Sequence, residues 1–344
     1  MIILIDGFWG SGKTTLRYLL DGHSELKVSP SQESIISAFE RNQNKSKFYS
    51  YKDIRLIREF LATSYYYNLE LESSEGYLDH DINRKTLSFD FYEFEKYWIN
   101  KLRNIDQWDT EKILNTIYSS IIKFYYKTSD FPINDKKVIV EDNNFNCHKF
   151  FLNEMKDSKL IVAKRSPSDN LVSLLNRATI SNNYKTEGYK KYSFNYLVRN
   201  QHFPIRINKN YEITEQLKKE FPGRIYECEF KNLIYNTEDE MKKISKFLDI
   251  TYEDILLKAT HFGENIRFKN GDDVLNKEKY TAKKTFSDYQ IKLIEQFEKK
   301  FPKYNFLSLS FLEFIFIKSF YLIKLFSRNI IKFFAKKLKS IYEG

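Results

Sequence analysis

The chain has 344 residues, 42% of them hydrophobic and 17% aromatic, which is enough to bury a sizeable core in one large domain or in a core with an insertion. Only 10 glycines and 6 prolines are present, which indicates a chain rich in regular structure, mainly helix. The net charge of +10 suits nucleic acid, an anionic membrane and a phosphorylated small molecule equally. The two cysteines, Cys147 and Cys228, exclude a disulfide framework and a zinc site with paired ligands, and they indicate a reducing compartment.

The chain opens on a short apolar run, residues 2–5, that ends at Asp6 and Gly7. This pattern predicts a buried parallel strand feeding a tight turn. A helix is predicted next, over residues 14–20. No secretory signal is visible before the strand, so we expect a cytoplasmic protein.

Later apolar runs have the same strand character and are separated by helical patterns. The predicted strands cover residues 137–141, 160–164 and 225–229, and the predicted helices between and after them cover residues 146–155, 168–175 and 238–248. Strands that alternate with helices in this way predict an α/β fold of three layers, α/β/α, around a central parallel sheet.

Two segments depart from this alternation. Between about residues 44 and 135 the chain is polar and aromatic, with Gly76 as its single glycine. We expect a helical insertion there that covers the ligand edge of the sheet and supplies substrate contacts, although a purely structural role is equally open. A composition shift near Pro302 then divides the chain into a main domain, residues 1–302, and a basic apolar segment, residues 303–344.

A glycine loop follows the first predicted strand. Residues 7–14 read Gly-Phe-Trp-Gly-Ser-Gly-Lys-Thr and satisfy the phosphate-loop pattern G-x-x-x-x-G-K-[ST] between a strand and a helix. Glycines let successive backbone N–H groups turn around an anion, and the start of the helix adds partial positive charge. The residues expected to hold a phosphate are Gly10, Ser11, Gly12, Lys13, Thr14 and Thr15. The motif leaves open whether that phosphate belongs to ATP, GTP or a phosphosulfate donor.

Residues beyond the loop carry a resemblance to a known family. Residues 7–23 resemble, without gaps, the opening of bacterial carbohydrate-type sulfotransferases, whose loop is similar to G-F-P-[RK]-S-G-T-[TS]-L-L followed by L-L-D-G-H-P. The Leu-Leu-Asp-Gly-His run at 19–23 belongs to no general phosphate loop, so it supports the resemblance independently. The resemblance implies 3′-phosphoadenosine 5′-phosphosulfate (PAPS) as donor, 3′-phosphoadenosine 5′-phosphate (PAP) as product, and no metal.

A second block, residues 163–173, is similar to the family's R-x-P-x-D-x-x-x-S segment. Arg165 leaves the end of a predicted strand, and Ser173 returns on a facing turn of the helix that follows, so the two can clamp one phosphate from two sides. In the family this clamp takes the 3′-phosphate of the donor. The alternative is a strand-end arginine in a surface salt bridge with Asp169 as a helix cap. A third block, residues 230–250, resembles a structural signature of the family.

The loop also departs from the family pattern. Gly10 stands where the family has Arg or Lys, and Lys13 stands where it has Thr, so the loop cation has moved toward the helix. The family's K-T-P after the second strand is replaced by Asp-Asn-Asn at residues 142–144. Lys13 can still neutralise the leaving phosphate, or the altered loop can hold a nucleoside triphosphate.

Sulfuryl transfer needs positioning, a stabilised leaving group and a base for the acceptor proton. We assign the stabilisation of the leaving group to Lys13. The family carries a catalytic Glu after a Pro shortly beyond D-G-H-P, and the corresponding stretch here ends in Gln32 and Glu33. We predict Glu33 as the base, with His23 and His80 as alternatives. The expected acceptor is a hydroxyl of a carbohydrate or glycolipid.

The C-terminal segment has the pattern of an interfacial helix. Most of its charged residues between 311 and 339 fall within about 140° of a helical wheel, opposite a face of Phe, Ile and Leu. No charge-free run reaches the ~20 residues of a spanning helix. We expect this helix to bind the anionic inner face of the membrane, while packing on the protein or on a second subunit is the alternative.

Two other functions compete with the sulfotransferase interpretation. A Mg²⁺-dependent P-loop kinase or NTPase is favoured by the Lys13-Thr14 pair and by an acidic strand end at Glu141 and Asp142, which could bind the metal. A nucleic-acid binder would suit the basic charge, but no recognisable module supports it and we expect no nucleic-acid partner. No motif in the chain identifies the acceptor or an oligomeric state.

Overall fold

The computed structural model describes residues 1–33, 35–42, 49–61, 82–83, 90–104, 107–126, 137–142, 147–183, 203–268, 275, 291 and 294. Several sequence predictions therefore fall wholly or partly outside the described residues. The C-terminal segment 303–344 and His80 lie outside them entirely. The predicted insertion is described only in parts.

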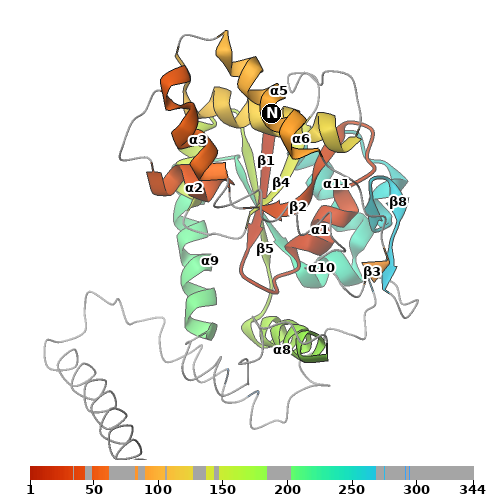
Figure 1. Cartoon of the computed structure of the whole chain (residues 1–344). Helices are drawn as coiled ribbons and strands as arrows, with labels where there is room; N and C mark the ends of the chain where they lie inside the picture. The colour runs from red at the N-terminus through yellow and green to blue at the C-terminus, as the bar shows by residue number, and fades with distance from the viewer. Residues whose placement is uncertain are drawn as a thin grey trace, which may run out of the picture.

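A parallel five-stranded sheet forms the centre of the molecule (Figure 1), in the order β2-β4-β1-β5-β6. Its strands are β1 (Ile2–Gly7), β2 (Leu26–Glu33), β4 (Lys137–Asp142), β5 (Lys159–Lys164) and β6 (Ile225–Glu229). The predicted parallel α/β fold is confirmed. Because β4 and β5 flank β1, the glycine loop lies at the middle of the sheet's carboxyl edge, where ligands of open α/β sheets bind.

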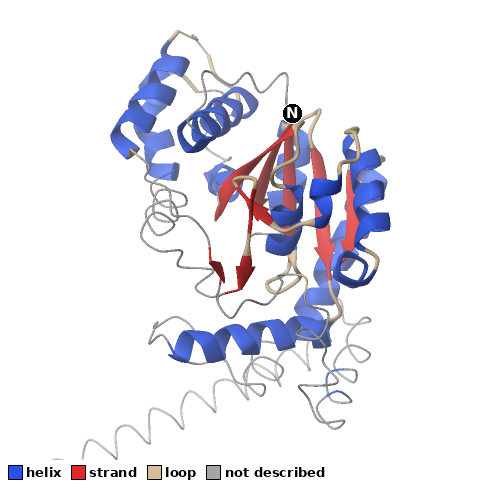
Figure 2. Ribbon diagram, turned by 90° about the vertical axis from the view of Figure 1, so that its right-hand side faces the viewer, coloured by secondary structure: helices blue, strands red, loops and turns tan. Residues whose placement is uncertain are grey.

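The alternating side chains of β1 show why both faces of this sheet must be covered. Ile2 and Leu4 are buried in one hydrophobic cluster, and Ile3 and Ile5 are buried in another on the opposite face. An uninterrupted apolar strand of this kind is stable only between two layers of helices. Figure 2 shows the strands between helices on both sides.

One face carries α1 (Lys13–Leu20), α10 (Phe230–Tyr235) and α11 (Thr237–Leu248). The other carries α2 (Ile35–Asn42), α3 (Ile54–Leu61), α5 (Phe91–Arg103), α6 (Thr110–Tyr126) and α7 (His148–Glu154), and α9 (Phe203–Glu220) joins it through Leu217. Beyond the carboxyl edge lies α8 (Pro167–Asn183), drawn in light green in Figure 1. The shorter elements are η1 (Tyr51–Asp53), β3 (Ile82–Asn83), η7 (Asp254–Leu257), β7 (Thr260–His261), β8 (Glu264–Asn265) and β9 (Arg267–Phe268).

The described helices of the predicted insertion, residues 44–135, belong to the core. Trp98 of α5 and Ile117 of α6 are fully buried in the cluster that contains Ile2 and Leu4 of β1. These helices therefore cover one face of the sheet rather than its ligand edge, so for the described residues the prediction that the insertion covers that edge is wrong. The prediction that the insertion also contacts substrate falls on its remaining residues, which the structure does not describe.

The stretch from Ser29 to Glu33 has no apolar strand pattern in the sequence, yet it is a strand in the structure. It is the second half of β2, which pairs with β4 so that Glu33 lies opposite Asp142. The register shifts between Val28 and Gln32, around Pro30, as expected where a proline enters a strand. Because serines and a proline interrupt the apolar pattern, the sequence does not predict this strand. Pairing with the buried β4 stabilises it.

The two cysteines behave as small buried hydrophobes. Cys147 and Cys228 are both free and fully buried. Burial raises the pKa of each thiol well above its usual value, with carboxylates nearby, Asp142 for Cys147 and Glu240 for Cys228, acting in the same direction. Both side chains therefore stay protonated. Over the described residues, no helix has the length and hydropathy needed to cross a bilayer.

Candidate functional site

The loop between β1 and α1 wraps around a turn in which the Ser11 N–H donates to the Phe8 carbonyl at 2.9 Å. Phe8 is buried, whereas Trp9 at the tip of the loop is 45% exposed. Gly12 occupies the N-cap of α1 and provides no side-chain cap to the first turn of the helix. The helix start therefore offers its backbone N–H groups at the middle of the carboxyl edge.

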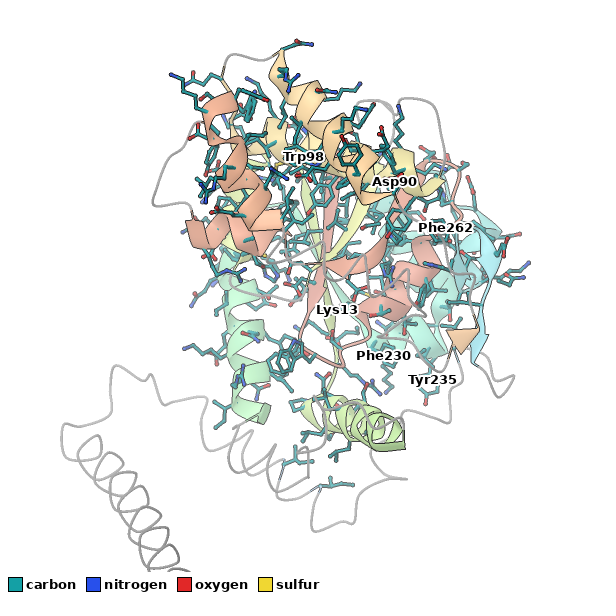
Figure 3. All side chains as sticks on the ribbon, in the orientation of Figure 1. Lys13, Asp90, Trp98, Phe230, Tyr235 and Phe262 are labelled. Atoms are coloured by element: carbon teal, nitrogen blue, oxygen red, sulfur yellow. The ribbon has the colours of Figure 1, made fainter. Side chains whose placement is uncertain are left out.

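The contact with α10 requires a glycine at position 12. Its backbone is left-handed, with φ +97°, and a Cβ at this position would lie 2.0 Å from Cδ2 of Phe230. No side chain fits there unless the ring moves. Lys13 and Phe230 are both labelled in Figure 3 and mark this end of the sheet.

Gly10 is held in the same way by α8. Its φ is +80°, and a Cβ would lie 3.1 Å from the carbonyl oxygen of Asn170 and 3.2 Å from Cβ of Ser173. A basic residue at position 10, which the family pattern leads one to expect, would be strained in backbone and crowded by α8. The departure at Gly10 thus has a steric reason, namely the close contact between loop and helix.

The structure brings Arg165 and Ser173 to the same glycine. Arg165 follows β5, is only 5% exposed, and donates from Nη1 to the Gly10 carbonyl at 3.1 Å. Its guanidinium also lies over the Phe230 ring, 4.3 Å from the centroid. The predicted surface position of Arg165 in the alternative interpretation is therefore wrong. The helix cap of that interpretation is also wrong, because the cap is Ser166: its hydroxyl accepts from the Asp169 N–H at 3.2 Å and donates to the Asp169 carboxylate at 2.8 Å.

Tyr211 of α9 fixes the backbone from which Arg165 projects. The Arg165 N–H donates to the Tyr211 hydroxyl at 2.8 Å, and that hydroxyl donates to the Arg165 carbonyl at 2.7 Å. Burial raises the pKa of Tyr211 far above its ordinary value, so the hydroxyl remains a donor. Arg165 is thereby anchored through both its main chain and its guanidinium.

The Lys13 side chain points away from the tip of the loop and toward the carboxyl ends of β1 and β4. Its Nζ lies 2.9 Å from the Asp142 carbonyl, 3.3 Å from the Gly7 carbonyl and 3.7 Å from Oδ1 of Asp6. Asp6 is in turn fixed by the Gly7 N–H at 2.6 Å and by Nε2 of His148 at 2.7 Å. The ammonium group is thus placed at the base of the loop beside a buried carboxylate.

Thr14 and Arg17, one turn apart on α1, share the carboxylate of Glu141 at the end of β4. The Thr14 hydroxyl donates to Oε1 at 2.8 Å, and Nε of Arg17 lies 2.8 Å from Oε2. Arg17 also donates from Nη1 to the carbonyls of Ser29 and Pro30, at 3.1 and 2.5 Å. This buried ion pair ties α1, β2 and β4 together beneath the loop.

The loop also holds a polar atom that an anion would satisfy. Ser11 is fully buried, and its hydroxyl has no hydrogen-bond partner among the residues that the structure describes. A buried hydroxyl without a partner is unusual in folded proteins. Together with the backbone N–H groups of the helix start, it makes the loop fit a phosphate or phosphosulfate group.

The predicted bases have different outcomes. Glu33 ends β2 and its backbone pairs with Asp142, but its side chain lies outside the described part. His23 is buried, with Nδ1 accepting from the Glu25 N–H at 3.1 Å and Nε2 lying 2.7 Å from the Thr251 carbonyl. Both ring nitrogens of His23 are thus engaged in structural contacts, which argues against a role as base.

Sequence reasoning missed Arg17 and Asn170, and it assigned Phe230 only to a structural block. The sequence holds a partial signal for Arg17. It lies one helical turn after Thr14, so both side chains can reach the same acidic residue at the end of a neighbouring strand. Within the described ranges, no group of three or more His, Cys, Asp or Glu side chains could hold a metal ion.

The contact between Gly12 and Phe230 predicts a specific stability loss for Gly12→Ala. Gly223→Ala is the matched control, because Gly223 also has a positive φ, +76°, but nothing lies within 4 Å of its would-be Cβ. We expect Gly223→Ala to lower the free energy of unfolding by about 1–2 kcal/mol and Gly12→Ala to lower it by about 1–3 kcal/mol more. Urea denaturation measures both, and equal losses would contradict the steric account.

A match to a protein family identifies the family of this chain. A family model described as the sulfotransferase family matches residues 3–254, and no curated protein matches the chain. A solved sulfotransferase domain from the curacin biosynthetic pathway is 15% identical, with a TM-score of 0.46, over 86% of this chain and 96% of its own. The sulfotransferase domain of a Synechococcus olefin synthase is 14% identical, with a TM-score of 0.47, over 88% and 96%. Because the family model matches most of the chain, residues 3–254, the chain belongs to the sulfotransferase family.

Proposed function

We propose that this sulfotransferase uses PAPS as donor and transfers the sulfuryl group to a hydroxyl of a carbohydrate or glycolipid. The observation that carries the proposal is the position of Arg165, whose Nη1 contacts the carbonyl of the loop residue Gly10 at 3.1 Å. Arg165 and Ser173 both lie beside Gly10, and we assign to these two side chains a second phosphate site next to the loop. A nucleotide with phosphates on both its 5′ and 3′ positions needs two such groups, whereas ATP carries a single phosphate chain.

The chain's own residues divide the work of binding. The backbone N–H groups of residues 10–15 and the Ser11 hydroxyl would hold the 5′-phosphosulfate. Arg165 and Ser173 would hold the 3′-phosphate, which a guanidinium suits because its N–H groups match phosphate oxygens. Lys13 would place positive charge on the phosphate that leaves.

The reaction forms one bond to sulfur as another breaks. The acceptor oxygen bonds to sulfur while the bond between sulfur and the bridging phosphate oxygen breaks, and PAP departs with the electron pair. The acceptor proton goes to a base, which we assign to Glu33 at the end of β2. The strand end places this residue at the same carboxyl edge as the loop, since β2 and β1 are both parallel to β4.

A P-loop kinase or NTPase is the second candidate, and one observation favours it. The Thr14 hydroxyl lies 2.8 Å from the carboxylate of Glu141 at the end of the neighbouring strand. In triphosphate-binding loops a Thr or Ser and an acid from a neighbouring strand hold Mg²⁺ together. The same pair of groups exists here, and Arg17 lies against it.

Replacing Glu33 tests the assigned base. We expect Glu33→Gln to reduce sulfuryl transfer from PAPS by at least about 100-fold, because the acceptor proton then has no carboxylate to receive it. PAP should stabilise the variant against heat as much as it stabilises the wild type. Glu59→Gln is the control, since this carboxylate lies exposed on α3 and should leave transfer unchanged. Normal turnover of Glu33→Gln would remove Glu33 from the mechanism.

We also propose that the segment 303–344 binds an anionic membrane surface, where a lipid-linked glycan would be within reach. Its basic and apolar faces support this, as lysines favour anionic headgroups and Phe, Ile and Leu favour the acyl boundary. Truncation after Pro302 should abolish co-sedimentation with vesicles that contain phosphatidylserine, while transfer to a soluble acceptor continues. Unchanged co-sedimentation of the truncated protein would show that the segment is not the anchor.

A further inference from the structure

Trp9 stands at the outer corner of a tight turn at the tip of the phosphate loop. The turn runs from Phe8 to Ser11, because the Ser11 N–H donates to the Phe8 carbonyl at 2.9 Å. Gly10 at the third position has a φ of +80°, and Trp9 at the second position is not among the residues with a positive φ. This combination is that of a type II turn. The indole projects outward from its corner and is 45% exposed.

Tryptophan is an unusual residue for this corner. Proline is common at the second position of a type II turn because its fixed φ suits that position. The loop pattern G-F-P-[RK]-S-G, which this chain resembles, has proline there, whereas the chain has Trp9. A proline would also restrict the unfolded chain and so favour folding, which tryptophan does not. The backbone of the turn therefore does not account for the indole.

The indole is supported from inside the loop by Phe8. The Phe8 side chain is only 6% exposed, and its ring centroid lies 6.4 Å from that of Trp9, with the two planes at 41°. Arg206, near the start of α9, places its guanidinium carbon 5.8 Å from the centre of the same Phe8 ring. Phe8 is thus fixed between the loop and α9. A flat ring on such a support offers a large contact area and loses little conformational entropy when a ligand binds.

The chemistry of the second reactant suits this ring. The polar groups assigned to the donor, the N–H groups of residues 10–15 and the Ser11 hydroxyl, follow Trp9 along the loop, and none of them involves its side chain. The acceptor hydroxyl has to reach sulfur at the mouth of the same loop. A pyranose ring carries apolar C–H groups on its faces and hydroxyls around its edge. An indole can therefore cover one face of the sugar and leave a hydroxyl free to attack.

We propose that Trp9 determines acceptor specificity, by stacking its indole on the face of the pyranose ring whose hydroxyl receives the sulfuryl group. Acceptors that present a flat, apolar sugar face are favoured over acceptors that lack one. This role of Trp9 rests on the proposed function, which supplies a carbohydrate acceptor and a donor bound in the loop.

The three tryptophans of the full-length chain allow a direct test by fluorescence. Trp98 and Trp108 are fully buried, so quenching by acrylamide reports mainly on Trp9. The probes are the methyl glycosides of glucose, galactose and N-acetylglucosamine, each titrated with and without PAP. We expect at least one of them to lower the acrylamide quenching constant by about twofold, because a stacked sugar covers one of the two faces of the indole.

Variants at position 9 separate a role in binding from a role in the turn. Trp9→Pro removes the indole and keeps a residue that suits the corner, so we expect it to bind PAP as the wild type does. Its affinity for the protecting glycoside, measured by calorimetry, should fall by about tenfold. Trp9→Phe keeps a flat ring and should retain most of that affinity, and Trp9→Ala makes the same truncation if Trp9→Pro does not fold.

Tyr92→Ala is the matched control for the loss of an exposed aromatic ring. Tyr92 is 73% exposed on α5, which Figure 1 shows at the end of the sheet where β1 begins, away from the loop. Its replacement should leave the affinity for the glycoside unchanged.

Three results would overturn the proposal. They are no protection of the indole by any of the three glycosides, an unchanged glycoside affinity in a folded Trp9→Pro or Trp9→Ala variant, and a loss of PAP affinity in Trp9→Pro, which would place the adenine ring on the indole instead. The outcome is separable from that of the proposed function. Binding of PAP without glycoside protection would remove the role of Trp9 and leave the donor assignment intact, whereas glycoside protection in a chain that does not bind PAP would do the reverse.

Discussion

Charge buried at the carboxyl edge of the sheet is the constraint on which this site depends. Lys13 and Arg17 bring two cations from α1 beneath the loop, and Asp6 and Glu141 bring carboxylates from β1 and β4 to meet them. An unpaired charge in such surroundings would be strongly destabilising, so the position of each cation is fixed by a specific acid. The loop geometry follows, because α1 cannot rotate or shift without separating these pairs.

The neighbours of the two inner loop glycines add a steric constraint to the electrostatic one. Phe230 of α10 packs against Gly12, and Asn170 and Ser173 of α8 pack against Gly10. Arg165 joins the two contacts, since it lies over the Phe230 ring and donates to the Gly10 carbonyl. Two segments distant in sequence from the loop, residues 165–173 and α10, therefore meet at it, and this convergence distinguishes the site from a bare phosphate loop.

Much of the fold could be predicted because its strands are buried on both faces. The apolar runs at residues 2–5 and 137–141 stand out in a polar sequence and correspond to β1 and β4. β2 could not be recognised, because Ser29 and Pro30 resemble a turn and only pairing with β4 makes them a strand. A sequence pattern reveals a strand when its residues are apolar because they are buried. It does not reveal a strand that is stabilised mainly by pairing with its neighbour.

The site could be predicted in part for a related reason. The motif spacing predicted the loop, and the family resemblance predicted Arg165 and Ser173 as site residues. The structure places both of these residues beside Gly10. The pairing of Arg17 with Glu141 was missed because it depends on the strand order, which brings β4 next to β1, and the sequence does not reveal that order. The role of Glu33 as base stays a prediction.

Two features of the loop favour different nucleotides. Lys13 and Thr14 follow the triphosphate pattern, yet the acid that would complete a metal site is bound by a guanidinium. Isothermal titration calorimetry of the wild type with PAP, and separately with ATP and Mg²⁺, tests the central claim most directly. The account predicts that PAP binds with a measurable affinity at least about tenfold tighter than that of ATP with Mg²⁺. Tight binding of ATP with Mg²⁺ and no binding of PAP would contradict it.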